Sequence, residues 1–282
     1  MLGVSAEAIK TKQHRLLWVL LAIMVFVEIL MIGGMRYWAT HVPNSGAEPS
    51  DELIKIRTST SFPGVILPTL TFSATFGTIF AVIFASRLGG EEYRFGTAKQ
   101  MMSMGVSRSR YAFGKLLASV LISMIFIVVP VVAASAFTII VSVLSREPLL
   151  VEPITVSLVS QVARGLGIAW VCLGFYSGLA VFLAIATRQS QTATTIAILI
   201  ILLEGNIVNS FAERFSFIRK IAPYSMGRCA NIAASLIEQA QDVLDAVSTR
   251  DVTNAFITLG VWFALFTVCA VSIFKRQELG AD

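Results

Sequence analysis

Long apolar segments dominate the chain and alternate with shorter polar connections. A helix needs about 20 mostly apolar residues to cross the roughly 30 Å hydrocarbon core of a bilayer. Six segments meet that requirement: Leu16–Met35, Val65–Ser86, Leu116–Leu144, Gly165–Thr187, Gln191–Phe211 and Thr253–Phe274. Four of them contain no charged residue, and the first and fifth contain one acid each. The pattern predicts an all-α polytopic membrane protein with six transmembrane helices.

Two of these segments have features that affect the expected helices. Leu116–Leu144 is longer than a straight crossing requires, and Pro130 near its middle predicts a kink. Apolar character also precedes Arg164, so the fourth helix is expected to begin nearer Thr155. Within that helix, residues 174–178 form a GxxxG pattern, which permits close helix approach. Packing inside the chain is favoured over a dimer contact.

Composition excludes a water-soluble fold. Of the 282 residues, 56 % are hydrophobic and only 14 % are charged, against about 25 % charged in soluble domains. The same figures exclude a disordered or collagen-like chain. The three cysteines have no CxxC or histidine-rich spacing, so neither a disulfide framework nor a metal site is indicated. Since no Gly/Ser- or Pro-rich linker divides the chain, residues 1–282 are expected to form one transmembrane domain.

The basic residues predict an orientation. The connections on one side of the membrane are shorter in total than those on the other side. They nevertheless contain twelve of the 22 Lys and Arg residues. Cytoplasmic loops carry this excess, so both the N- and the C-terminus are predicted to be cytoplasmic. Residues 87–115 then form a cytoplasmic loop, and residues 212–251 form a long outer loop. This topology explains the net charge of +5 better than binding to nucleic acid does.

The loop 87–115 contains a short amphipathic pattern. Its apolar side chains Ala98, Met101, Met102 and Gly105 follow helical spacing, and Lys99, Gln100 and Ser103 occupy the opposite face. Thr97 is a candidate cap for this helix, and Ser107 is a candidate cap for the next one. Two interpretations stay open on these residues alone. The segment either anchors to anionic lipid headgroups or docks on a partner protein, which a methionine-rich face suits.

The wider loop has a recognisable order of residues. It reads E-x-R-x-G-T, then a gap of nine residues, then S-R-S-R and G-K-L-L. This order resembles the ABC-2 type permeases, the six-span membrane subunits of ATP-driven exporters with a type V exporter-like architecture. The matching positions are Glu92, Arg94, Gly96, Thr97, Ser107, Arg108 and Lys115. The resemblance implies that the loop is a coupling helix seated in a cleft of a cytosolic nucleotide-binding subunit, with Met101 on its apolar face.

The resemblance also implies partners. The chain has no GxxxxGK[ST] loop with which to hold ATP phosphates, so no cofactor is expected on this chain, and ATP and Mg²⁺ are expected on a separate ATPase subunit. The other expected partner is a second permease copy or a homologous permease, in a homodimer or heterodimer within the lipid bilayer. The implied activity is ATP-driven export of a peptide, drug or other amphipathic substrate across the bacterial plasma membrane.

Two other classes stay as alternatives. One is a stand-alone channel or scaffold that works without an ATPase. The other, less favoured, is an intramembrane enzyme, because Glu91 and Glu92 are similar to the double glutamate of CAAX-type proteases. Gly96 stands where that motif has an arginine, and the only histidines, His14 and His41, lie outside the apolar segments. The pair that would activate water or bind a metal is therefore missing.

Charged residues inside the apolar segments are candidates for a translocation path or gate. Glu28 lies near the middle of the first segment, where an acid costs about 2.5–3.5 kcal/mol. It is expected either to face such a path or to be protonated or hydrogen-bonded at a helix contact. Glu204 precedes Gly205 and Asn206, which weaken the helix and predict either a gate-forming bend or an interfacial end. Arg164 is expected to snorkel to the interface or to pair with one of the acids.

The outer loop 212–251 predicts an amphipathic helix. Ile232, Leu236, Ile237, Ala240, Val243, Leu244 and Val247 share one face of it. Such a helix either lies on the outer leaflet or folds back as a lid. In the ABC-2 type permeases, which the chain resembles, this position holds short re-entrant helices. The charges of Arg214, Arg219 and Lys220 argue against deep re-entry of that part.

Overall fold

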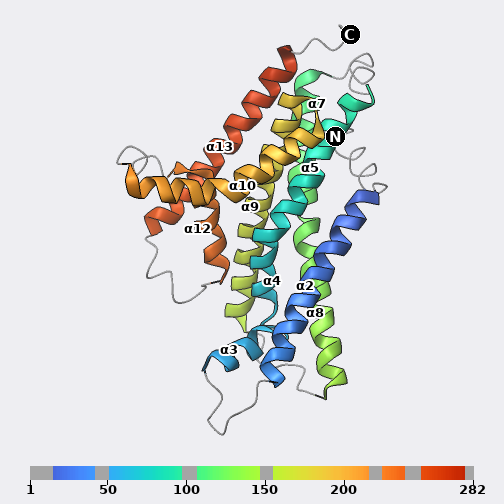
Figure 1. Ribbon diagram of the computed structural model, residues 1–282, viewed down its shortest axis with the longest axis vertical. Helices are drawn as coiled ribbons and strands as arrows, with labels where there is room; N and C mark the ends of the chain where they lie inside the picture. Colours follow the sequence, from blue (N-terminus) through green and yellow to red (C-terminus); the bar gives the residue numbers. More distant parts are fainter. Residues whose placement is uncertain are drawn as a thin grey trace.

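The computed structural model describes residues 15–41, 51–96, 107–146, 155–215, 224–238 and 249–276. These residues form helices and no strand, as the apolar pattern predicts. Figure 1 shows an elongated bundle in which most helix axes follow the long direction of the molecule. In chain order the elements are α2 (Arg15–His41), α3 (Asp51–Ser59), α4 (Ile66–Phe72), the π-helix η1 (Ser73–Gly77), α5 (Thr78–Arg94), α7 (Arg108–Ser123), α8 (Ile125–Leu144), α9 (Val156–Thr187), α10 (Ser190–Arg214), α12 (Met226–Glu238) and α13 (Thr249–Arg276).

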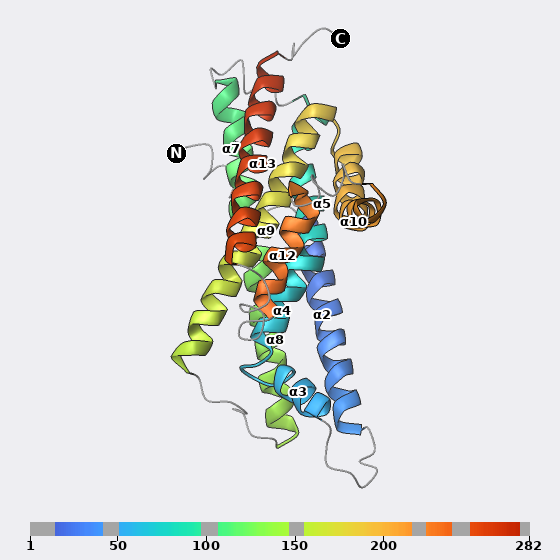
Figure 2. The ribbon, with the colours of Figure 1, turned by 90° about the vertical axis from the view of Figure 1, so that its left-hand side faces the viewer.

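Five helical stretches in the described residues are long and apolar enough to cross a membrane. They are Arg15–Thr40, Ile66–Tyr93, Arg108–Leu144, Val156–Thr187 and Val252–Arg276. They correspond to five of the six predicted segments, with the second beginning one residue later than predicted. The sixth, Gln191–Phe211, lies in α10, and the stretch of that helix whose side chains the structure describes, Ser190–Leu203, is too short to count as a crossing by itself. The later part of α10 turns across the long axis of the bundle (Figures 1 and 2). A sixth crossing is therefore not confirmed.

Helix α9 is the central element of the bundle, because α5, α7, α10, α12 and α13 all pack against it. A β-carbon added to Gly174 would lie 3.1 Å from Val120 of α7, and one added to Gly178 would lie 2.5 Å from Phe263 of α13. The GxxxG pattern thus serves packing within the chain, as predicted. The hydroxyl of Thr155 accepts a hydrogen bond from the Leu158 amide at 3.3 Å and caps the helix. The early start of α9 is confirmed.

The third apolar segment is interrupted at Met124, and α8 continues through Pro130. In a regular helix the Met124 amide would donate to the Val120 carbonyl, but here it donates to Leu121 at 3.3 Å. The Val120 carbonyl instead accepts from the Trp170 indole at 2.9 Å and from the Ser123 hydroxyl at 2.7 Å. The interruption therefore lies more than a turn before Pro130, where a side chain of α9 competes for a backbone oxygen.

Helix α12 folds back onto the bundle, where it packs against α9, α13 and α4 (Figure 2). Its side chains Cys229, Ala233 and Ile237 are buried. The outer-leaflet alternative is therefore wrong for Met226–Glu238, because the apolar face of the helix is covered by protein. The rest of the predicted amphipathic helix, from Ala240 on, and the charges Arg219 and Lys220 lie outside the described residues.

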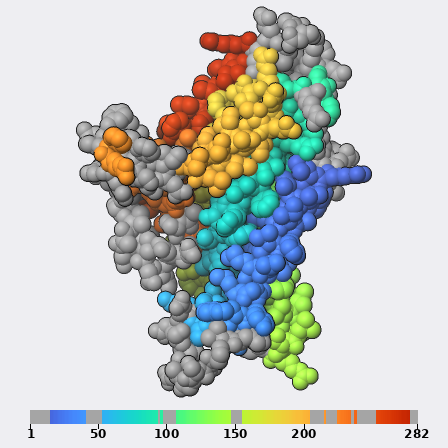
Figure 3. Space-filling model, in the orientation of Figure 1, coloured from blue at the N-terminus to red at the C-terminus, as the bar shows by residue number. Residues whose placement is uncertain are grey.

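Helix α2 lies at one edge of the bundle, beside α5 and α8 (Figures 1 and 3). Its outer face exposes large apolar side chains such as Phe26, Leu30 and Trp38. Its inner face buries Met24 and Glu28 at helical spacing. An exposed apolar face of this extent suits contact with lipid or with another membrane protein.

Candidate functional site

The two helices that flank the loop 95–107 are joined by a buried ion pair. The Lys115 ammonium of α7 lies 3.2 Å from a carboxylate oxygen of Glu92 on α5, and both side chains are 2 % exposed. Lys115 also donates to the Leu88 carbonyl at 2.7 Å. The Tyr111 hydroxyl donates to the other Glu92 oxygen. Two residues named from the sequence, Glu92 and Lys115, are thus in direct contact.

These contacts explain how two charges are accommodated without water. An isolated buried charge costs several kcal/mol, and a pair is tolerated only where hydrogen bonds satisfy its remaining donors and acceptors. Each Glu92 oxygen has a partner on α7, and Lys115 has a second acceptor on α5. The Lys115 ammonium also lies 5.2 Å from the centre of the Tyr111 ring. The pair therefore fixes α5 and α7 to each other.

The end of α13 joins the same cluster. Phe274 is fully buried and stacks on Tyr111 with ring centres 5.0 Å apart. Tyr93 of α5 meets the same Phe274 ring edge-on at 6.3 Å. Arg108, in the first turn of α7, donates to the Lys275 carbonyl at 2.8 Å. Three helices distant in sequence are thus tied together beside the loop.

Backbone geometry marks where the flanking helices end and begin. Gly96 has a φ of 67°, a left-handed conformation that ends α5 and favours glycine. Ser107 occupies the N-cap position of α7 with extended backbone, although its hydroxyl makes no capping hydrogen bond. Thr97, Met101 and the predicted amphipathic helix lie outside the described residues, as does the side chain of Arg94.

Replacing Gly96 with alanine is expected to destabilise the end of α5, because a β-carbon disfavours positive φ by about 1–2 kcal/mol. Nothing lies within 4 Å of the added carbon, so the loss comes from backbone strain alone. Gly96→Asn should lose less. The free energy of unfolding of the purified protein measures both changes. Gly34→Ala is the control, at an α2 position that is equally open but has no positive φ. Equal stability of G96A and G34A would contradict the expectation.

The intramembrane acids are placed differently from each other. Glu28 is buried in the middle of α2, and neither of its oxygens has a hydrogen-bond partner among the described residues. Arg164 is exposed on α9, so the alternative in which it pairs with Glu28 is wrong. The backbone of α10 stays helical through Glu204 and Asn206 to Arg214. The side chains of Glu204 and Asn206 lie outside the described residues.

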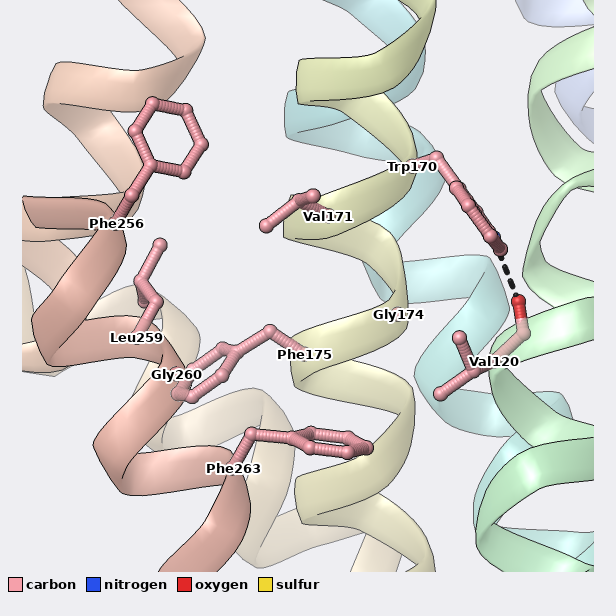
Figure 4. A pocket seen from close by; sticks show the side chains of 9 residues that line it. All are labelled: Val120, Trp170, Val171, Gly174, Phe175, Phe256, Leu259, Gly260 and Phe263. Atoms are coloured by element: carbon pink, nitrogen blue, oxygen red, sulfur yellow. Dashed lines mark hydrogen bonds between the residues drawn. The ribbon is translucent and has the colours of Figure 1, made fainter. Parts of the chain in front are cut away.

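An apolar cavity of about 360 Å³ lies between α7, α9 and α13. Figure 4 shows its lining side chains, with Trp170 bonded to Val120 on one side and the rings of Phe256 and Phe263 on the other. None of the path, gate or coupling candidates selected from the sequence lines it. The GxxxG glycine Gly174 was the available signal, because a residue without a side chain leaves space beside its helix.

The two glutamates considered for an intramembrane enzyme belong to separate ion pairs. Glu91 lies 3.3 Å from Arg87 on the same helix, whereas Glu92 faces Lys115 across the helix interface. Two carboxylates that share one reaction centre would have to converge on one point. The arrangement suits a structural contact between helices.

These observations define a multi-pass helical membrane protein with a buried polar contact beside one loop. The family model described as ABC-2 family transporter protein matches residues 4–205. That match covers well over half of the chain, so the chain belongs to the ABC-2 transporter family, as its loop motif predicted. Members are membrane transport components that are not themselves catalytic and generally pair with an ATPase subunit. Among curated proteins, the comparison gives no match.

Proposed function

We propose that the chain is the permease subunit of an ATP-driven exporter, and that the loop 87–115 receives movement from a separate cytosolic ATPase subunit. The observation that carries this proposal is the buried Glu92–Lys115 pair, because it joins the two helices on which such a loop would act. A second permease copy or a homologous permease would complete the transporter. The cargo is an amphipathic molecule such as a peptide or drug, and the membrane is the bacterial plasma membrane.

The contacts suggest how a push on the loop would spread. The pair makes α5 and α7 move together, and Arg108 and Phe274 extend that unit to α13. Helix α5 also meets the start of α10 very closely, since a β-carbon on Gly90 would lie 2.6 Å from the Ser190 nitrogen. Displacement of α5 would therefore tilt α10 as well. In this mechanism α2 and α10 tilt and open a path between two permeases.

The candidates for that path or its gate are Glu28, Glu204, Asn206 and Arg164. Charged and amide side chains on membrane helices are costly, so they are retained mainly where they face protein or water. The exposed position of Arg164 on α9 and the change in direction of α10 are compatible with this role (Figure 1). In the proposed mechanism these four residues contact the cargo or gate its path.

Reversing the charge of Arg108 tests the coupling role. Arg108→Glu removes the bond to the Lys275 carbonyl and places an acid beside it, so ATPase activity should persist while transport falls at least tenfold. Glu92→Lys should act in the same direction. The permease is co-purified with a candidate ATPase subunit, reconstituted in vesicles, and assayed for hydrolysis and for uptake of peptides and drugs. Arg110→Glu is the matched control, because Arg110 is exposed in the same turn of α7.

Normal transport by R108E would overturn the coupling role. Transport by the permease alone, without an ATPase, would favour the stand-alone channel instead.

A further inference from the structure

A cluster of buried oxygen atoms surrounds Glu28 in the middle of the bundle. The side chains of Glu28, Thr69 and Ser73 are at most 2 % exposed. Thr69 on α4 lies beside the Glu28 carboxyl, and its side chain interacts with that carboxyl. Within the described part of the chain, no hydrogen bond of normal geometry reaches either Glu28 oxygen, the Thr69 hydroxyl or the Ser73 hydroxyl. Buried polar atoms are almost always satisfied, so these oxygens have the capacity to hold a further ligand.

The packing of α2 against α4 and η1 places Ser73 in this cluster. Met24 of α2 contacts Gly77 at the end of η1, where a β-carbon would lie 2.8 Å from the methionine. Glu28, one turn further along α2, lies beside Thr69. Ser73 is one turn from Gly77 and one turn from Thr69 on the same helical stretch. Helical spacing therefore puts Ser73 on the same face of this stretch as Gly77, which Met24 contacts. The π-helix η1 begins at this serine, and such insertions occur often at functional sites.

The third wall of the cluster is α8, which runs alongside α2 (Figure 1). Gly33 of α2 faces Phe137 of α8, and this register puts Pro130 within about a turn of the level of Glu28. Pro130 has no N–H, so it cannot donate the usual helical bond to the Phe126 carbonyl. That backbone oxygen is left without its normal helical donor on the helix that closes the site.

We propose that Glu28, Thr69 and Ser73 bind a dehydrated monovalent cation of the size of Na⁺ or K⁺, with the Phe126 carbonyl as a further ligand. All available donors are oxygen atoms, which hard cations prefer. The single carboxylate would balance one positive charge, whereas divalent ions in protein cages usually take more than one carboxylate. A bound cation would satisfy the buried oxygens and offset the cost of a carboxylate inside the membrane.

Cation binding of this kind is separate from the proposed transport function. It takes place on the permease itself, so binding can be measured without ATP, an ATPase or a known cargo. A failure here would leave the coupling role untouched, and a failure of the coupling test would leave this site untouched.

Thermal unfolding of the purified full chain in detergent tests the site. NaCl and KCl are titrated against N-methyl-glucamine chloride at constant ionic strength, and the melting temperature is measured. Since a ligand that binds only the folded state stabilises it, Na⁺ or K⁺ should raise the melting temperature by roughly 3 °C at tenfold over its dissociation constant, and above that concentration the rise should follow the logarithm of the salt concentration. Glu28→Gln and Thr69→Val should abolish the rise. Pro130→Ala should reduce it, because alanine restores the donor to the Phe126 carbonyl.

Thr78→Val is the matched control. Thr78 is equally buried on α5, but its hydroxyl already donates to the Ala74 carbonyl at 2.6 Å, so T78V should keep the full rise. An identical melting temperature in all three salts would overturn the proposal, and so would a rise that survives in both E28Q and T69V. The proposal would also be overturned if the melting temperature responded to pH but not to the salts, and if that response were lost in E28Q. The site would then bind a proton.

Discussion

Replacing Lys115 with methionine is expected to lower the free energy of unfolding by about 3–5 kcal/mol. The change keeps the length of the side chain but removes the ammonium that lies 3.2 Å from the Glu92 carboxylate, which is 2 % exposed. The hydrogen bond from the Tyr111 hydroxyl, which carries no charge, would stay. Unfolding of the purified protein, followed by circular dichroism during denaturant titration, measures the loss. Arg110→Met is the matched control, because it removes an exposed charge from the same helix.

A double-mutant cycle separates the ion pair from general packing. The variant with both Glu92→Gln and Lys115→Met removes both charges, so it should recover a large part of the loss seen in K115M alone. A loss below about 1 kcal/mol in K115M, the size typical of a surface pair, would contradict the burial of this contact. Additive effects in the cycle would show that Glu92 and Lys115 do not interact.

The positions of the helices were largely predictable, because a bilayer imposes a minimum length of apolar sequence. The direction of α10 was not predictable in the same way. The helix continues through the predicted segment to Arg214, but its later part turns across the long axis of the bundle (Figure 1). A hydropathy pattern records composition and does not record the direction of a helix.

The break inside the third apolar segment was not predictable from the local sequence, because it depends on a contact with another helix. Pro130 was the visible helix breaker, yet α8 continues through it and the break is at Met124. Its cause is Trp170, 50 residues away from the Val120 carbonyl that it binds. Proline effects are encoded locally, whereas competition for a backbone oxygen arises only when two helices are packed together.

At the candidate site, too, the sequence identified residues but not the contacts between them. The loop motif selected Glu92, Arg108 and Lys115 by resemblance, but not the contacts that they make. Glu92 and Lys115 are on different helices, and Arg108 bonds to a carbonyl 167 residues later in the chain. Glu28 was selected because an acid in a membrane helix is costly. Thr69 and Ser73 gave no signal, since hydroxyl side chains are common in membrane helices and usually bond to their own backbone.

Replacing Gly90 with alanine is expected to lower the free energy of unfolding by about 3 kcal/mol, at the upper end of the range for overpacking. A β-carbon there would lie 2.6 Å from the Ser190 nitrogen and 2.8 Å from its α-carbon. Backbone atoms cannot rotate away as a flexible side chain can, so α5 and the start of α10 must separate. Gly90 lies only two residues before Glu92, so the separation should also disturb the buried pair.

Gly114→Ala provides the control for this change. Gly114 is on α7, next to Lys115, and has no atom within 4 Å of an added β-carbon. Alanine there should be neutral or stabilising by up to about 1 kcal/mol through its higher helix propensity. Denaturant unfolding of G90A and G114A in parallel therefore separates a close helix contact from a general effect of glycine replacement. If G90A is as stable as G114A, α5 does not approach α10 closely, and the proposed transfer of movement from the loop to α10 loses its physical basis.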